Sequence, residues 1–374
     1  MTLTPQNEAE LAEAIKGSAG PLKIRGGGTR PVGQPGAGAV LSTTGLRGVR
    51  LYEPGALTLV VGGGTALSEV EALLASENQR LAFEPMDHRA LLGTQGESTI
   101  GAVVAANISG PRRVQAGACR DFLLGVRFVD GRGDILKNGG RVMKNVTGYD
   151  LVKLMAGSFG TLAVLSEVSL KVLPRPETEA TLALEGLDDA RAVAALSAAL
   201  GSAFDVTGAA HRPGGQTLIR LEGFAASVAY RVERLTAHLA RFGAPKIISD
   251  AQNSAALWRG VRDVADFHGG GGDVWRISVK PSDGPKVGDR LDGIATGLLY
   301  DWGGGLIWAR VAEGTDLRSH LAGIPGHARL ERAADAVKAR LGVFGSGGAV
   351  ADRLAAGLRA RFDPDGKLNR GLMG

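Results

Sequence analysis

The sequence predicts an α+β protein with two domains and a separate helix near the carboxyl end. Three observations support this fold class. The glycine-rich segments Arg25–Arg30 and Gly96–Gly101 each adjoin strand-like sequence, and apolar residues alternate with others along Leu162–Val172, as in a strand. The run Pro174–Pro176 then interrupts the pattern, and the region after it is rich in alanine and less dependent on glycine. We therefore expect a domain boundary at about residue 175.

Composition limits the class of protein. A chain of 374 residues exceeds one ordinary hydrophobic core, and 44% hydrophobic residues are typical of a globular protein with two or three domains. The 57 glycines follow no strict period, which excludes a collagen-like chain and favours turns and backbone-lined binding loops. The net charge of +5 is spread along the chain without a basic tract, so nucleic acid is not an expected partner.

The first predicted domain spans residues 1–175, in two subdomains of about 1–80 and 81–175. It begins with a short helix, for which Thr4 is the predicted N-cap, Pro5 the first helical residue, and Leu11 and Ile15 the core-facing positions. Strands are expected at residues 49–53 and 57–61, followed by a helix capped by Thr65. Because the polar, acidic start lacks the pattern of a signal peptide and no apolar run approaches about 20 residues, we expect a cytoplasmic protein.

The second subdomain and the rest of the chain follow from the same patterns. Strands are expected at 125–129 and 162–172, with Asp130-Gly131 as a hairpin turn leading to 134–136. Residues 176–340 form a smaller α+β domain with strands at 217–221 and 275–279 and a helix at 225–242. Residues 341–374 contain a helix whose apolar stripe is expected to pack on an earlier part of the chain; the stripe consists of Val350, Leu354, Leu358 and Phe362.

The first glycine segment has the properties of a phosphate-binding loop. Three glycines follow the strand-like Leu22–Ile24, so several backbone N–H groups are exposed in a tight turn. A dinucleotide fingerprint of the Rossmann type is excluded because Pro31 occupies the position of its last glycine and no helical pattern follows. Cys119 is the only cysteine, so an iron–sulfur cluster must belong to a partner. The six histidines are scattered, and no metal site is expected.

Four motifs in order resemble the FAD-binding domain of the vanillyl-alcohol oxidase and p-cresol methylhydroxylase (PCMH) superfamily. They are Arg25–Arg30, Ser98–Gly101, Cys119–Gly125 and Gly157–Leu162. This resemblance implies a two-subdomain PCMH-type FAD-binding domain, a smaller α+β cap domain at 176–340, and a C-terminal helix that returns to the FAD domain. With the segments Gly148–Leu151 and Phe362–Asn369, the whole chain is similar to the family of FAD-binding E subunits of bacterial glycolate oxidase.

The resemblance also implies the cofactor and its contacts. Arg30 stands where related proteins carry a histidine that attaches the flavin covalently, so we expect non-covalent FAD. Two assignments have structural alternatives: Arg120 could form a salt bridge with Asp121, and Asn369 could simply end a helix. The expected FAD-binding residues are Arg25, Gly26, Gly27, Gly28, Thr29, Arg30, Ser98, Thr99, Gly101, Arg120, Asp121, Gly160, Val164 and Asn369.

No catalytic base can be named from the sequence. Oxidation of a 2-hydroxy acid requires a cation for the carboxylate and a base for the hydroxyl proton. Related enzymes carry a histidine-bearing G-D-G-N-x-H segment, which has no match here, and a late H-G-x-G element, to which His268–Gly270 is the nearest candidate. His327 is expected to be structural or close to the flavin. Arg276 could face an anionic substrate or be solvated or ion-paired.

Three functions remain open. The first is the FAD-binding subunit of a glycolate oxidase or dehydrogenase, acting with a related catalytic flavoprotein subunit and an iron–sulfur subunit, with membrane contact through those partners. The second is a self-sufficient FAD-dependent dehydrogenase for D-lactate or another 2-hydroxy acid. The third is a scaffold that binds FAD weakly or not at all, against which the retained glycine loop argues.

Overall fold

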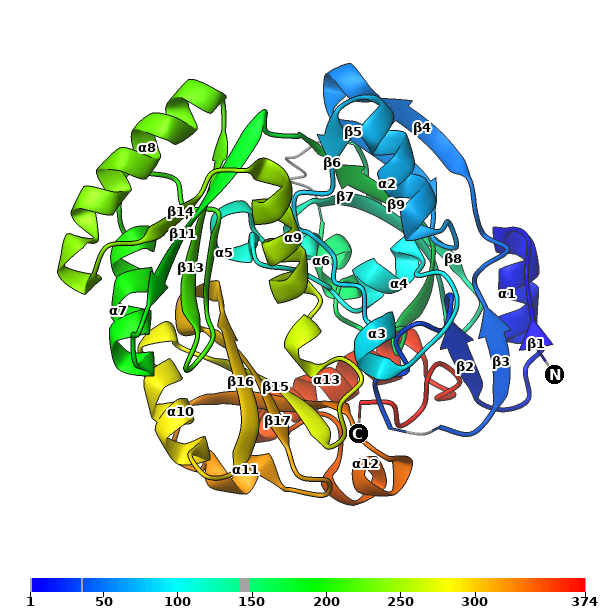
Figure 1. The fold of residues 1–374 in the computed structure, drawn as a ribbon. Coiled ribbons are helices and arrows are strands. Elements are labelled where there is room, and N and C mark those ends of the chain that lie inside the picture. The colour runs from blue at the N-terminus through cyan, green and yellow to red at the C-terminus, as the bar shows by residue number, and fades with distance from the viewer. Residues whose placement is uncertain (1, 35, 142–147, 374) are drawn as a thin grey trace.

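The computed structural model describes residues 2–34, 36–141 and 148–373. Its strands form four sheets, of which the largest have five and eight strands. Figure 1 shows the first half of the chain, in blue to dark green, on one side and the later part, in green to orange, curving around the other. The predicted α+β class is confirmed.

The chain begins with a small sheet that carries the first glycine segment. This sheet is parallel, in the order β1-β3-β2, and helix α1 (Glu8–Lys16) packs on it through Leu11 and Ile15, as predicted. The predicted N-cap Thr4 is wrong: the cap is Asn7, because its Oδ1 accepts a hydrogen bond from the Glu10 amide at 2.9 Å. The strands of this sheet are β1 (Thr2–Leu3), β2 (Leu22–Arg25) and β3 (Ala39–Ser42).

The five-stranded antiparallel sheet holds the largest core of this half. Its order is β4-β5-β9-β7-β8, and three helices pack on it: α2 (Leu67–Ser76), α4 (Ile100–Ala105) and α6 (Leu151–Met155). Two short helices, α3 (Arg89–Leu92) and α5 (Arg113–Ala116), lie in the connections. The predicted strands and hairpin are confirmed within two residues, except that β8 ends three residues later than predicted. The strands are β4 (Val49–Glu53), β5 (Thr58–Gly62), β7 (Leu123–Asp130), β8 (Ile135–Gly139) and β9 (Ala163–Lys171).

The expected cap at Thr65 is also wrong. Helix α2 begins at Leu67 after Ala66, and the Thr65 hydroxyl instead accepts a hydrogen bond from the Gly48 amide at 2.9 Å. The Thr65 hydroxyl therefore takes part in a hydrogen bond to a distant part of the chain and does not cap α2.

A two-stranded ladder lies where the chain leaves this half: β6 (Gln79–Arg80) pairs with β10 (Leu173–Pro174). The next strand, β11, belongs to the eight-stranded sheet. The domain limits 1–175, 176–340 and 341–374 stay predictions.

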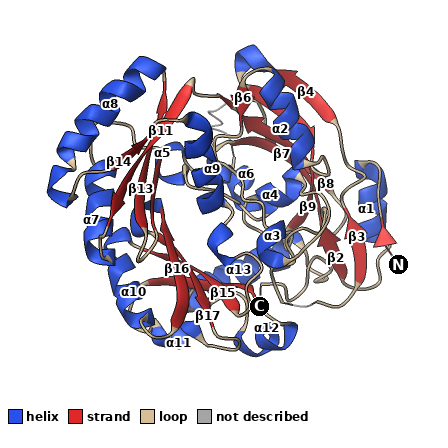
Figure 2. Cartoon of the chain, viewed as in Figure 1, coloured by secondary structure: helices blue, strands red, loops and turns tan. Residues whose placement is uncertain are grey.

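The eight-stranded sheet has buried hydrophobic clusters on both of its faces. Its order is β14-β11-β13-β12-β16-β17-β15-β18, and every pairing is antiparallel. On its outer side lie α7 (Asp189–Leu200), α8 (Ala225–His238), α10 (Gly284–Leu291) and α11 (Leu317–His320), as Figure 2 shows. The strands are β11 (Thr178–Glu185), β12 (Gly208–His211), β13 (Gln216–Gly223), β14 (Lys246–Ile248), β15 (Asp273–Val279), β16 (Ala295–Asp301), β17 (Leu306–Val311) and β18 (Gly326–Arg332).

The inner face of this sheet meets the first half of the chain. Helix α9 (Ala251–Arg262) covers one part of it through Trp258. Over the other part, Val274 and Trp308 pack with Met86 and Leu91 of the first half in one buried cluster. The inner face of β15 and β17 is therefore turned toward the first half of the chain.

The C-terminal segment corrects one expectation. In α13 (Ala349–Phe362) the side chains of Val350 and Leu354 are 63% and 62% exposed, so the apolar stripe does not pack on the described residues along its length. Only its last member, Phe362, is partly buried, against the Phe128 ring at 6.4 Å. After α12 (Asp335–Leu341) and α13, the tail returns to β2, where Leu22 and Leu368 form a parallel bridge.

Candidate functional site

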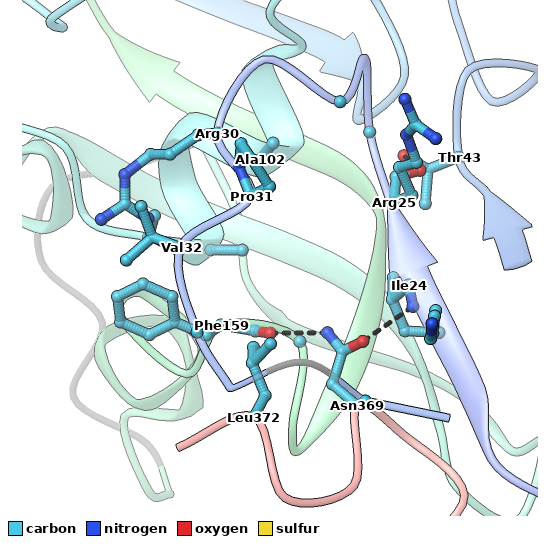
Figure 3. A pocket seen from close by; sticks show the side chains of 18 of the residues that line it. Ile24, Arg25, Arg30, Pro31, Val32, Thr43, Ala102, Phe159, Asn369 and Leu372 are labelled. Atoms are coloured by element: carbon cyan, nitrogen blue, oxygen red, sulfur yellow. Dashed lines mark hydrogen bonds between the residues drawn. The ribbon is translucent and has the colours of Figure 1, made fainter. Parts of the chain in front are cut away.

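A cavity of about 670 Å³ opens beside the first glycine segment. Its walls come from β2, the loop after it, the start of α4, the start of β9 and the C-terminal tail, which are far apart in sequence (Figure 3). Among its charged lining residues, five are cationic and one, Asp335, is anionic. The cations are Lys23, Arg25, Arg30, Lys338 and Arg370. The lining therefore favours an anionic ligand.

The loop at residues 26–30 presents backbone donors to this cavity. No acceptor lies within hydrogen-bond reach of these five amides in the part of the chain that the structure describes. Gly27 packs so closely that a Cβ there would lie 1.5 Å from the Glu97 carbonyl oxygen, and Gly28 has φ +76°. Both positions therefore require glycine. A run of unpaired N–H groups around a concave turn is suited to phosphate oxygens.

The second motif adds hydroxyl groups at the same place. Thr99 is 2% exposed, and its Oγ1 has no hydrogen-bond partner among the described residues. A Cβ on Gly26 would lie 2.3 Å from this oxygen, so the hydroxyl stands directly behind the glycine loop. Ser98 and Gly101 line the cavity, but the Gly101 amide already donates to the Gly63 carbonyl at 2.8 Å. The free amides and the Ser98 hydroxyl fit a dianionic pyrophosphate, whereas Thr99 does not line the cavity and its hydroxyl is buried against Gly26.

Asn369 supports the cavity wall through both ends of its side-chain amide. Its Oδ1 accepts from the Ile24 amide and its Nδ2 donates to the Phe159 carbonyl, each at 2.8 Å (Figure 3). Gly160, with φ +69°, leaves room for this amide, since a Cβ would lie 2.9 Å from Nδ2. Val164 lines the cavity from β9. Asn369 therefore holds β2, the turn before β9 and the tail together.

The side chain of Arg30 extends from the loop to the eight-stranded sheet. Its guanidinium donates to Glu331 at 2.8 Å and to His88 Nε2 at 3.1 Å, and it lies over the Phe159 ring. Because an arginine can only donate, His88 Nε2 is the acceptor and the ring is neutral. Burial and the neighbouring Arg30 lower the pKa of His88 to about 3. Arg329 also donates to Glu331, at 2.7 Å, and these cations hold the pKa of Glu331 far below its usual range.

The third motif lies apart from the cavity. Arg120 and Asp121 are about half exposed, do not line the cavity, and lie 3.8 Å apart, as the salt-bridge alternative expects. Cys119 is fully buried in the core, where desolvation raises the pKa of its thiol strongly. The structure therefore brings the first, second and fourth motifs and Asn369 together, but not Arg120 or Asp121.

Sequence reasoning missed His88, Phe159, Lys338 and Glu331. Glu331 alternates with His327 and Arg329 along β18, which indicates a common face, but nothing local marks the distant residue it contacts.

Comparisons with known proteins agree with this geometry. The family described as "FAD binding domain" matches residues 1–139. The chain is 33% identical over 356 residues to glycolate oxidase subunit GlcE of Escherichia coli, covering 94% of this chain and 92% of GlcE. The chain belongs to the GlcE family. The cofactor of this chain is FAD. It is held without a covalent bond, and position 30 of the loop carries an arginine.

Other relatives cover less of the chain. Glycolate oxidase subunit GlcD of Bacillus subtilis is 44% identical over 85 residues, 23% of this chain and 18% of GlcD. D-lactate dehydrogenase of Anaerostipes hadrus is 32% identical over 158 residues, 41% of this chain and 31% of that enzyme. Among solved structures, alkyldihydroxyacetonephosphate synthase superposes with a TM-score of 0.71 at 16% identity, covering 98% of this chain and 76% of that one. This last similarity establishes the fold alone.

Two absences concern the described residues only. Within residues 2–34, 36–141 and 148–373, His, Cys, Asp and Glu side chains nowhere gather in a group of three or more that could hold a metal ion. Across the same ranges, none of the helices combines the length and apolar character needed to span a bilayer.

Proposed function

We propose that this chain is the FAD-binding subunit of a glycolate oxidase complex, which oxidises glycolate to glyoxylate. The observation that carries the proposal is the donor-lined cavity in a chain that matches GlcE over 94% of its length. Bound FAD supplies the acceptor for the hydride that leaves the alcohol carbon. The chain itself supplies the binding and the orientation of that cofactor.

Each wall of the cavity has a part in holding the cofactor. The amides of residues 26–30 and the hydroxyl of Ser98 donate to the pyrophosphate. Gly101, Gly160 and Val164 line the rest of the cavity. Asn369 lines the cavity and keeps its walls at a fixed separation through its two hydrogen bonds.

The position of His268 supports dependence on a partner for catalysis. His268, nearest to the late histidine element of related enzymes, uses its Nε2 to donate to the Asp263 carbonyl at 2.7 Å. That nitrogen cannot accept a substrate proton while it carries this one. His268 does not line the cavity either.

The names of two relatives, subunits GlcE and GlcD, support a complex of several subunits. We extend this to a related catalytic flavoprotein subunit and an iron–sulfur subunit that takes electrons from the flavin. The lone, buried Cys119 of this chain is consistent with a cluster in a partner. A cytoplasmic location, peripheral at the inner membrane through the complex, belongs to the same proposal.

Anaerobic reduction of the flavin tests the proposal. The FAD-loaded chain is mixed with glycolate or D-lactate, alone and after co-purification with the related flavoprotein subunit, and the visible absorbance is followed. We expect bleaching by glycolate in the complex and none in the isolated chain. Prompt bleaching by D-lactate in the isolated chain would instead establish a self-sufficient dehydrogenase.

A further inference from the structure

Helix α13 is left uncovered by the rest of the described chain. None of its 14 residues is buried, whereas every other helix of eight or more residues among the described ones has at least two buried residues. Three apolar residues of α13, spaced four apart, are exposed: Val350, Leu354 and Leu358. We call these three residues the exposed stripe.

A helix exposed in this way is marginal by itself. Isolated helices shorter than about 12 to 15 residues are barely stable in water, because most helical stability comes from the packing of an apolar face. Gly357 lies three residues after Leu354, on the side of the stripe, and a glycine in a helix interior is less stable than an alanine. Nothing lies within 4 Å of a Cβ at this position, so no contact within the chain requires a glycine there. A second molecule that approaches this side of α13 closely accounts for both features.

The side of the helix that carries the stripe has positive charge and no carboxylate. Arg353 and Arg361 each follow a member of the stripe by three residues, so they share its side of α13. Neither arginine forms an ion pair with a described residue. Asp352 lies two residues from two members of the stripe, on the opposite side, and its carboxylate accepts hydrogen bonds from the segment before the helix. The surface therefore combines apolar side chains with two free cations.

This combination distinguishes between possible occupants. A second copy of the chain would place the same arginines against each other, and like charges across an interface oppose binding. Helices that lie in a membrane surface carry their cations on the polar face, whereas Arg361 stands on the apolar side of α13. A protein segment with apolar residues flanked by Asp or Glu matches both the stripe and its arginines.

We propose that the exposed stripe of α13 binds the related flavoprotein subunit of the complex, through a segment whose apolar residues are flanked by Asp or Glu. The inference rests on the proposed function and adds the surface at which the two subunits meet. We choose this partner because GlcD is the other subunit named among the relatives. Both neighbours of α13 along the chain reach the FAD site, since Lys338 of α12 and Asn369 of the tail line the cavity. A subunit bound to α13 is therefore joined to two segments of the cavity wall.

Binding of the FAD-loaded chain to the purified flavoprotein subunit, without substrate, tests the inference. We expect Leu354→Ala to raise Kd about 10-fold, as for a side chain in the centre of an interface. The variant should keep its fold, because Leu354 is exposed in the isolated chain. Phe224→Ala is the control: it removes an exposed apolar side chain next to α8 and should bind as the wild type does.

Two arginines of α13 give a matched pair of variants. Arg361→Gln removes a charge from the side of the stripe and should raise Kd about 3-fold at low salt, with a smaller effect at high salt. Arg359→Gln removes the same charge two residues away, on the opposite side of the helix, and should leave Kd unchanged. Equal effects of the two substitutions would contradict the charged face.

Hydrogen exchange provides a measurement that needs no variant. The amides of α13 should exchange rapidly in the isolated chain and at least about 10-fold more slowly in the complex, because packing stabilises a marginal helix. Unchanged exchange in a complex that has formed would place the interface elsewhere and overturn the inference.

Wild-type affinity in Leu354→Ala would also overturn the inference. A dimer of the wild type that Leu354→Ala dissociates would do the same, because a second copy would then occupy the stripe. So would sedimentation of the wild type, but not of Leu354→Ala, with vesicles that contain an anionic phospholipid. The proposed function fails separately, if glycolate leaves the flavin of the complex oxidised although Leu354→Ala weakens binding. If the wild type does not bind the subunit at all, the inference and the proposed complex fall together.

Discussion

Gly27 is the residue at which the FAD site has the least room. A Cβ there would overlap the Glu97 carbonyl at 1.5 Å, so Gly27→Ala must displace the loop and its amides. We expect its Kd for FAD to rise by at least about 10-fold, measured by titration of the apo chain with FAD. Gly55→Ala is the control, because nothing lies within 4 Å of a Cβ at that position. Equal FAD affinity in the two variants would contradict the assignment of the loop.

His88 makes the stability of the chain depend on pH. Its pKa of about 3 in the folded state lies below about 6.5 in the unfolded state, so between these values only the unfolded chain binds the proton. Stability contributed by neutral His88 is full above pH 6.5 and falls as the pH drops. At pH 5 the loss is about 2 kcal/mol. Between pH 7 and pH 5, urea unfolding should show a change in stability that is more unfavourable in the wild type than in His88→Gln by about this amount.

The glutamate beside His88 titrates in a lower window. The depressed pKa of Glu331 means that its contribution is present above about 4.3 and is lost only as the pH falls further. Glu331 therefore does not contribute to the change between pH 7 and pH 5. His327, whose pKa burial lowers, and Asp301, whose pKa burial raises to about 7, act in both chains, so the difference between wild type and His88→Gln reports His88. The same pH dependence in wild type and His88→Gln would contradict a neutral, buried ring.

At the scale of elements, the apolar residues of α13 differ in how far they are buried. Leu354 is 62% exposed, whereas Phe362 is partly buried against Phe128, and its carbonyl accepts from the Gly131 amide at 2.9 Å. We expect Phe362→Ala to lower the free energy of unfolding by about 2 kcal/mol and Leu354→Ala by less than about 0.5 kcal/mol. Chemical denaturation of both variants measures this, and a larger effect at Leu354 would show that the stripe is packed.

The elements also show which features sequence patterns predict. Alternation and turn residues predicted the strands and the hairpin at Asp130-Gly131, because those signals are local. The caps at Thr4 and Thr65 were wrong because another side chain or a distant amide competes for the same bond. The helical period of α13 was correct, but a period does not say whether a partner face exists within the same chain.

At the scale of the molecule, the Arg30–Glu331 pair joins the FAD loop to the eight-stranded sheet across 301 residues of sequence. Removal of the carboxylate charge in Glu331→Gln leaves Arg30 and Arg329 buried without a counter-charge, which should cost about 3 kcal/mol of stability. Glu97→Gln, at an exposed pair with Arg89, should cost less than about 0.5 kcal/mol. Equal effects in denaturation experiments would contradict a buried link between the halves.

The same long-range contacts set the limit of sequence reasoning for the site. The loop glycines and Ser98 line one cavity, and they could be grouped from sequence because each motif carries its own geometry. The meeting of Arg30 with Glu331, and of Arg276 with two tryptophans, depends on how the two halves pack, which no local pattern contains.

The visible absorption spectrum of the purified chain, before and after acid precipitation, tests the central claim most directly. We expect about one flavin per chain, released into the supernatant by acid, because the described site binds FAD through hydrogen bonds and charge alone. A chain that stays colourless after incubation with FAD, or flavin that precipitates with the protein, would contradict this account.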